Sequence, residues 1–125
     1  MTRRFPIRFD PIWKSFFSLL FLSPSQSYLE IREDDEVEVR MAWAFRARFP
    51  RSAVTQVEAS PRRVLSIGVH GMFGRWLVNG SSGGLAILTL EPVQRGRVLG
   101  FPVQLRELTV SVEDPEALGR ALVEE

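Results

Sequence analysis

The chain has 125 residues, of which 45% are hydrophobic and 25% are charged, a composition typical of a folded domain and not of a disordered chain. Its formal net charge of +1 excludes strong global steering of charged partners, although the cationic residues comprise fifteen arginines and one lysine. Because cysteine is absent, disulfides and metal–thiolate sites are excluded, and we expect a single domain over residues 1–125 in the reducing cytoplasm.

The N-terminal region combines an alternating segment with an apolar stretch. Phe5 to Phe9 alternates like a strand whose basic side chains point outward. The apolar stretch from Ile12 to Leu22 is too short to span a bilayer, which takes about 20 apolar residues in a helix. We favour a short amphipathic helix that packs on the core, with a signal peptide and an interfacial membrane anchor as the alternatives.

The next segment carries the strongest strand signal of the chain. After a short alternating run from Tyr28 to Ile31, apolar side chains occupy every second position from Val37 to Phe49. The acidic cluster at 33–36 lies between these runs and predicts a hairpin turn, whereas calcium binding is disfavoured because the glycine of a calcium loop is missing. We expect the long run to break near Ala42 to Phe45 and to end at Pro50.

Glycine and proline divide the second half of the chain. A short turn and strand follow around Val54 and Val57, and a strand over 64–69 is expected to end at the glycine-rich segment 70–74. The apolar runs 76–78 and 85–90 flank the loop 79–84, which predicts a hairpin. The sequence then predicts a loop over residues 92–100 and a strand over 103–112.

The last segment contains its own helix start. Asp114 can cap the first turn, Pro115 suits the first helical position, and Glu116 favours the positive end of the helix dipole. An apolar stripe follows at Ala117, Leu118, Ala121 and Leu122. We therefore expect a C-terminal helix that closes the open end of a β barrel or sandwich.

The order of these elements resembles bacterial pleckstrin-homology-like domains. The resemblance is carried by the run Val37–Val57, in which a strand and small turn lead to a strand that ends in proline, and by the closing strand and helix at Leu108–Val123. Residues 71–79 and 108–118 also resemble small proteins of high-GC bacteria. The resemblance implies a mainly β, antiparallel barrel or sandwich with a C-terminal capping helix and a short N-terminal helix. Such domains bind lipids, bind peptides or act as scaffolds, so the fold alone does not select a function.

Charge is concentrated between residues 40 and 63, which contain six arginines and one glutamate. Strand alternation places Arg40, Arg46 and Arg48 on one face, and with Arg51 they form the predicted ligand or partner surface, because guanidinium groups bind phosphates and carboxylates. The alternative is a solvated face on which acids such as Glu30 and Glu38 neutralise the arginines. Nucleic acid is not an expected partner at a net charge of +1. The arginine preference itself also fits a GC-rich genome.

The inventory for catalysis is small. His70 is the only histidine, and no Gly-x-Ser-x-Gly elbow is present. We select His70, Trp76 and Asn79 as a candidate functional loop, while the glycines at 80–84 favour a hairpin tip over a phosphate cradle because the lysine of a nucleotide-binding loop is missing.

These observations predict a noncatalytic binding or interaction module for a protein or an anionic ligand, without metal or cofactor. Peripheral membrane contact and homodimerisation through an uncovered sheet edge are further predictions. The alternative function is a small hydrolase or transferase that uses His70.

Overall fold

The computed structural model describes residues 2–11, 26–61 and 68–124. Two predictions fall outside these ranges: the helix over 12–22 and the beginning of the strand at 64–69. Within the described ranges the chain is mainly β and ends in one helical segment. The strands are β1 (Arg3–Pro6), β2 (Ser27–Ile31), β3 (Glu36–Met41), β4 (Phe45–Pro50), β5 (Val54–Ser60), β6 (Gly68–Met72), β7 (Arg75–Asn79), β8 (Leu85–Val98) and β9 (Phe101–Ser111).

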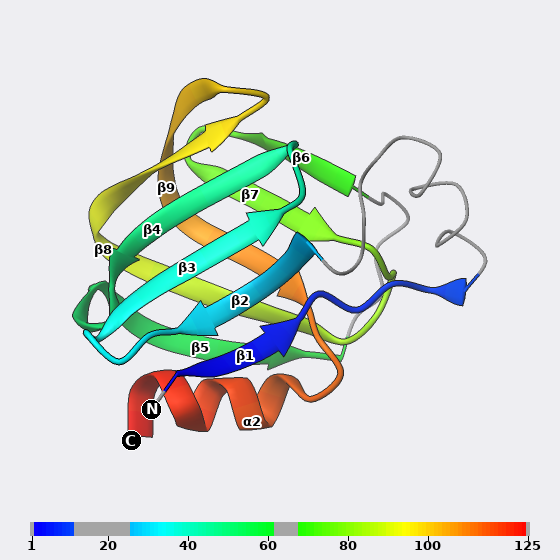
Figure 1. Cartoon of the computed structure of the whole chain (residues 1–125), viewed down its shortest axis with the longest axis vertical. Coiled ribbons are helices and arrows are strands. Elements are labelled where there is room, and N and C mark those ends of the chain that lie inside the picture. Colours follow the sequence, from blue (N-terminus) through cyan, green and yellow to red (C-terminus); the bar gives the residue numbers. More distant parts are fainter. Residues whose placement is uncertain (1, 12–25, 62–67, 125) are drawn as a thin grey trace.

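The described strands form one sheet that curls into a half-barrel (Figure 1). Its order is β1-β2-β3-β4-β8-β9-β7-β6, and β5 pairs with β8 outside this path. The curl depends on the long strand β8, whose first half pairs with β5 and whose last residues pair with β4. Strand β8 thus pairs with β5 along its first half and with β4 at its end. Residues of β4 and of the end of β8 therefore share a continuous outer face.

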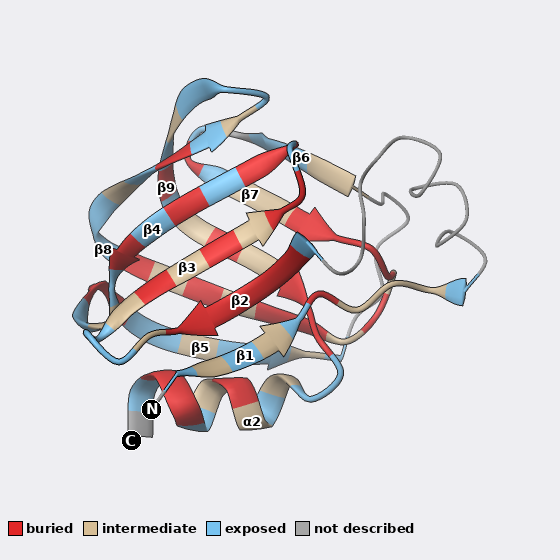
Figure 2. Cartoon of the chain, in the orientation of Figure 1, coloured by how far each residue is buried: buried red, intermediate tan, exposed pale blue. Residues whose placement is uncertain are grey.

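The core follows from the alternation in β3 and β4. In both strands every second residue is buried, and Val37, Val39, Met41, Phe45 and Phe49 are almost completely inaccessible. Figure 2 shows this alternation as bands along the two strands. The predicted break is confirmed, because residues 42–44 form the turn between β3 and β4 and Pro50 ends β4.

The acidic cluster forms the predicted hairpin turn between β2 and β3. The Arg32 N–H donates to the Glu36 carbonyl at 2.8 Å, and the Glu36 N–H donates to Asp34 Oδ1 at 3.2 Å. Asp35 takes a positive φ of 61°, which aspartate tolerates better than most residues. The side-chain bond of Asp34 to the backbone is the local reason for the turn.

The C-terminal helix is confirmed together with its cap. In α2 (Pro115–Gly119) the Asp114 Oδ1 accepts the Ala117 N–H at 3.1 Å, and Pro115 opens the first turn. The helical chain continues as the π-helix η3 (Arg120–Glu124). Leu118, Ala121 and Leu122 are buried in the main core, so this segment covers one end of the curled sheet.

Strand pairing moves one expected boundary and corrects three expectations. Strand β6 continues to Met72, three residues beyond the expected boundary at 69, and ends inside the glycine-rich segment 70–74, where residues 73–74 form the turn. The predicted hairpin across 79–84 is wrong, because β7 pairs with β6 and β9 and does not pair with β8. The β7–β9 pair is parallel, so the sheet is not wholly antiparallel.

The predicted loop at 92–100 is also largely strand. A register shift between Thr89 and Gln94 accommodates Pro92, after which β8 pairs again with β9 up to Val98. Because a proline is tolerated where the ladder is interrupted, it bends this strand without ending it. Only residues 99–100 form the turn.

Candidate functional site

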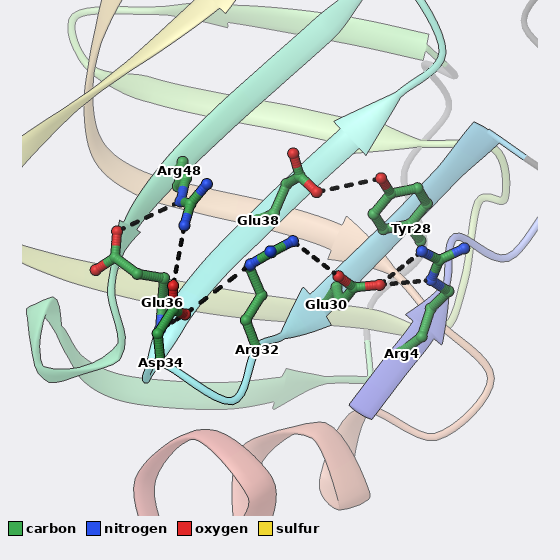
Figure 3. Close-up of polar contacts among 8 residues, drawn as sticks. All are labelled: Arg4, Tyr28, Glu30, Arg32, Asp34, Glu36, Glu38 and Arg48. Carbon is green, nitrogen blue, oxygen red and sulfur yellow. Dashed lines mark hydrogen bonds and ion pairs between the residues drawn. The ribbon is translucent and has the colours of Figure 1, made fainter. Parts of the chain in front are cut away.

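On the outer face of β1 to β4, the acidic side chains near β1 and β2 are paired with arginines or a tyrosine hydroxyl (Figure 3). Arg4 donates from Nε and Nη2 to Glu30 Oε2 at 2.8 and 2.6 Å, and Arg32 Nη1 lies 3.4 Å from Glu30 Oε1. Glu30 is buried, and its carboxylate raises the pKa of the Arg4 guanidinium through these hydrogen bonds. A buried carboxylate needs such hydrogen-bond partners, and Glu30 finds them in Arg4 and Arg32 at the β1–β2 end of the sheet.

The second acid on this face is also engaged. The Tyr28 hydroxyl donates to Glu38 Oε1 at 3.2 Å, and the Arg4 guanidinium lies 4.0 Å from the centroid of the Tyr28 ring. Glu30 and Glu38 were the expected partners of the arginines on β3 and β4. Neither has a hydrogen bond or ion pair to Arg40 or Arg46 in the described part of the chain.

Two of the four predicted surface arginines are paired with the acidic turn. Arg48 Nη2 lies 3.1 Å from Asp34 Oδ2, and its Nε lies 3.5 Å from Glu36. Arg51 lies beyond the end of β4, where Nη2 is 3.3 Å from Asp35 Oδ1 and Nη1 donates to a helix carbonyl at 3.2 Å. Arg48 and Arg51 are therefore both neutralised by acids of the β2–β3 turn.

The other two arginines, Arg40 and Arg46, lie on the same face as two arginines of β8 that the sequence analysis did not select. Arg40 lies directly opposite Arg46, and Arg46 lies directly opposite Arg97 of β8. A shallow hollow of about 220 Å³ lies beside Arg46 and Arg97. Its lining in the described chain is Arg46, Ala47, Arg48, Arg95, Gly96, Arg97 and Pro102.

We refer to Arg40, Arg46, Arg95 and Arg97 as the arginine surface. Arg40 Nε donates to the Ala42 carbonyl at 3.3 Å, and Arg97 Nη1 donates to the Gly100 carbonyl at 3.1 Å. Within residues 2–11, 26–61 and 68–124, the side chains of Arg46 and Arg95 form no hydrogen bond or ion pair. Like charges directly opposite each other destabilise a sheet, so this surface has an unfavourable electrostatic energy that an anion would relieve.

A local signal for Arg95 and Arg97 was present. The triplet Arg95-Gly96-Arg97 has arginines two positions apart, the spacing that puts both side chains on one face of a strand. In the sequence, the prolines and glycines around this triplet outweigh that spacing and favour a loop. The contact of the triplet with β4 depends on a pairing between distant segments, which no local pattern contains.

The candidate loop residues divide into two groups. His70 and Trp76 line an open pocket of about 1230 Å³ beside the β6–β7 hairpin, together with Leu77, Ile87 and Thr109. Asn79 is instead fully buried. Its Nδ2 donates to the Ser81 carbonyl at 2.8 Å, and its Oδ1 accepts the Gly68 N–H at 3.2 Å. Asn79 thus holds the backbone around the end of β7.

The glycine-rich loop at 80–84 is tied to the N-terminal segment. The Ser81 hydroxyl donates to Asp10 Oδ1 at 2.9 Å, and the Ser82 N–H donates to Asp10 Oδ2 at 3.2 Å. Phe9 forms an isolated bridge with Gly80. The carboxylate of Asp10 is therefore the anion that this loop binds within the chain.

Comparison of the chain with protein-family models, with curated proteins and with solved structures finds no match. Among the described residues, no group of three or more metal-ligating side chains comes together. No helix in those residues is both long enough and apolar enough to cross a membrane.

Proposed function

We propose that this protein is a noncatalytic, cytoplasmic binding module of pleckstrin-homology-like architecture, whose arginine surface binds an anionic ligand or an acidic segment of another protein. The curled sheet and the C-terminal helix support the architecture. The position of the arginines supports the ligand class, because guanidinium groups recognise phosphate and carboxylate oxygens with paired hydrogen bonds.

The observation that carries the proposal is the position of Arg46 between Arg40 and Arg97 in directly opposed pairs. The nearby acids are engaged elsewhere: Glu30 and Glu38 by Arg4 and Tyr28, and the acidic turn by Arg48 and Arg51. A bound anion would offset the repulsion within these two arginine pairs. Proteins retain such unfavourable local arrangements chiefly at functional sites.

The test uses tripolyphosphate and polyglutamate as probes with the full chain in isothermal titration calorimetry. We expect both probes to bind, and the variants Arg46→Gln and Arg97→Gln to weaken binding about fivefold each at low salt, the effect of losing roughly 1 kcal/mol. Arg120→Gln is the matched control, since Arg120 is an exposed arginine on the C-terminal helical segment. Equal binding by all three variants would refute the assignment of the surface.

The alternative function, a small hydrolase or transferase, has one observation in its favour. His70 lines the pocket beside the β6–β7 hairpin, and Ser60 and Glu107 line the same pocket. The variant His70→Gln separates the two functions. An enzyme would lose turnover while it remained folded, whereas a binding module would keep its affinity for the anionic probes.

A further inference from the structure

The arginine surface forms a row across the sheet. Arg40 of β3 lies opposite Arg46 of β4, and Arg46 lies opposite Arg97 of β8. Neighbouring strands are about 4.8 Å apart, so these three residues span about 10 Å across the strands. Arg95 lies two positions before Arg97 on β8 and lines the same hollow. The cations thus form a line, which suits the backbone of an extended polyanion.

Two arginines of the row are tied to turns that carry exposed aromatic rings. Arg40 Nε donates at 3.3 Å to the carbonyl of the residue before Trp43, whose side chain is 56% exposed. Arg97 Nη1 donates at 3.1 Å to the carbonyl of the residue before Phe101, which is 72% exposed. Each bond uses only one of the several N–H donors of a guanidinium group. The arginine surface is therefore held directly beside both rings.

The two turns form one rim at the end of the sheet. The Leu99 N–H of the β8–β9 turn donates to the Ala44 carbonyl of the β3–β4 turn at 2.9 Å, and Figure 1 shows the two turns side by side. Phe101 lies opposite Val98, so strand alternation places its ring on the face away from Arg97. The rim therefore has guanidinium groups on one side and an aromatic ring on the other.

The hydrophobic core does not explain the two rings. The core cluster of the described chain, together with the half-buried side chains packed against it, includes neither Trp43 nor Phe101. Large aromatic side chains gain little stability for the fold when they stay in water. They do provide flat surfaces on which nucleic-acid bases stack, with little dependence on the identity of the base.

We propose that this rim binds single-stranded nucleic acid: the phosphates lie along the arginine surface, and bases stack on Trp43 and Phe101. This inference rests on the proposed function and names the ligand of the same surface. The phosphate and the base of a nucleotide project in different directions from the sugar, which matches cations and rings on two sides of one rim. An acidic peptide supplies carboxylates without flat base faces, and a duplex keeps its bases stacked on one another.

The net charge of the whole chain predicts the opposite, because it is only +1. Net charge governs long-range attraction, whereas contacts with phosphates depend on the cations at the binding surface. The fold brings arginines of β3, β4 and β8 together, while Arg48 and Arg51 neutralise the acidic turn nearby. The rim is therefore locally cationic in a chain that is nearly neutral.

The experiment measures the fluorescence anisotropy of labelled oligothymidylate and oligouridylate of about 12 nucleotides with the full chain. The comparison ligands are the duplex of the oligothymidylate with its complement and a labelled polyglutamate of equal charge. We expect both single strands to bind about tenfold more tightly than either comparison ligand, because only single strands offer accessible base faces. The tighter of the two single strands identifies DNA or RNA as the source of the ligand.

Phe101→Leu is the decisive variant, because leucine keeps an apolar side chain but has no aromatic face. Its affinity for the single strands should fall about tenfold, the effect of losing one stacked base, whereas Phe101→Tyr should bind like the unaltered chain. The matched control is Phe73→Leu. Phe73 is 85% exposed on the β6–β7 turn, and neither of these strands pairs with β3, β4 or β8. This control should not change the affinity.

Arg46→Gln tests the phosphate contacts separately from the stacking. Its affinity for the single strands should fall about fivefold at low salt. The slope of log affinity against log salt concentration should become shallower by about 0.7, the contribution of one phosphate contact in a single strand. Arg120→Gln, at an exposed position on the C-terminal helical segment, should change neither quantity.

The outcomes separate this inference from the proposed function. If tripolyphosphate and polyglutamate bind as tightly as the single strands, the inference is wrong and the anionic ligand of the proposed function stands. The inference is equally wrong if Phe101→Leu binds the single strands as well as the unaltered chain does. If none of these anions binds, the proposed function fails together with it.

Discussion

At the scale of single residues, charge compensation differs between the two ends of one sheet face. Near β1 and β2 the buried Glu30 accepts hydrogen bonds from Arg4 and Arg32, and Glu38 accepts one from the Tyr28 hydroxyl. Near β8 the arginines oppose one another. Both ends obey the same cross-strand rule, which rewards opposite charges and penalises like charges. The first arrangement stabilises the fold, and the second is the basis of the proposed anion site.

This contrast predicts the effect of Glu30→Gln. The substitution keeps the shape of the side chain but replaces the carboxylate, whose Oε2 accepts two hydrogen bonds from Arg4, with a neutral amide. We expect the free energy of unfolding to fall by about 1–2 kcal/mol, because Arg4 is half exposed and water partly replaces its partner. Urea denaturation measures the change. Glu33→Gln, at an exposed position in the turn, should stay within about 0.5 kcal/mol of the unaltered chain, and an equal loss in both variants would contradict this role for Glu30.

At the scale of elements, two glycines differ in whether the structure has room for a side chain at their position. A Cβ at Gly80 would collide with the Phe9 ring, where the loop at 80–84 meets the N-terminal segment. A Cβ at Gly119 would meet Val57 at an ordinary distance of 3.5 Å. The first glycine is required by a close approach between two elements, and the second only lowers the helical propensity of α2.

Alanine substitutions should therefore change stability in opposite directions. Gly80→Ala is expected to lower the free energy of unfolding by roughly 1–3 kcal/mol, because the Phe9 ring must move. Gly119→Ala should raise it by up to about 1 kcal/mol through helical propensity. Thermal unfolding followed by circular dichroism gives the sign of each change. A gain in stability from Gly80→Ala would mean that the loop does not need its contact with Phe9.

At the scale of the whole molecule, the C-terminal helix and the curled sheet share one core. Leu118 is fully inaccessible and belongs to the same cluster as Val39, Phe45 and Leu108. The helix therefore does not pack as a separate appendage, because its apolar stripe completes the core of the half-barrel.

Removal of this contact should destabilise the whole sheet. Leu118→Ala is expected to cost about 2–5 kcal/mol, the usual effect of a cavity left by a buried leucine. Because helix and sheet share a core, unfolding monitored by tryptophan fluorescence and by far-ultraviolet circular dichroism should remain coincident. Loss of the helix alone, with an unchanged fluorescence transition, would show that the sheet is stable without it.

Local signals in the sequence predicted the local structure. The alternation from Val37 to Phe49, the acidic turn and the Asp114 cap each depend on side chains and backbone within a few residues, so the pattern alone was sufficient. The same alternation correctly placed Arg40 and Arg46 on one face.

Tertiary structure decided which of these strands meet. The parallel pairing of β7 with β9 and the contact of β4 with the end of β8 join segments far apart in the chain. Such pairings are selected by the packing of the complete core, and a local pattern contains no information about the partner strand. For this reason the sequence alone predicted half of the arginine surface, Arg40 and Arg46, whereas the place of Arg95 and Arg97 beside Arg46 emerged only from the fold.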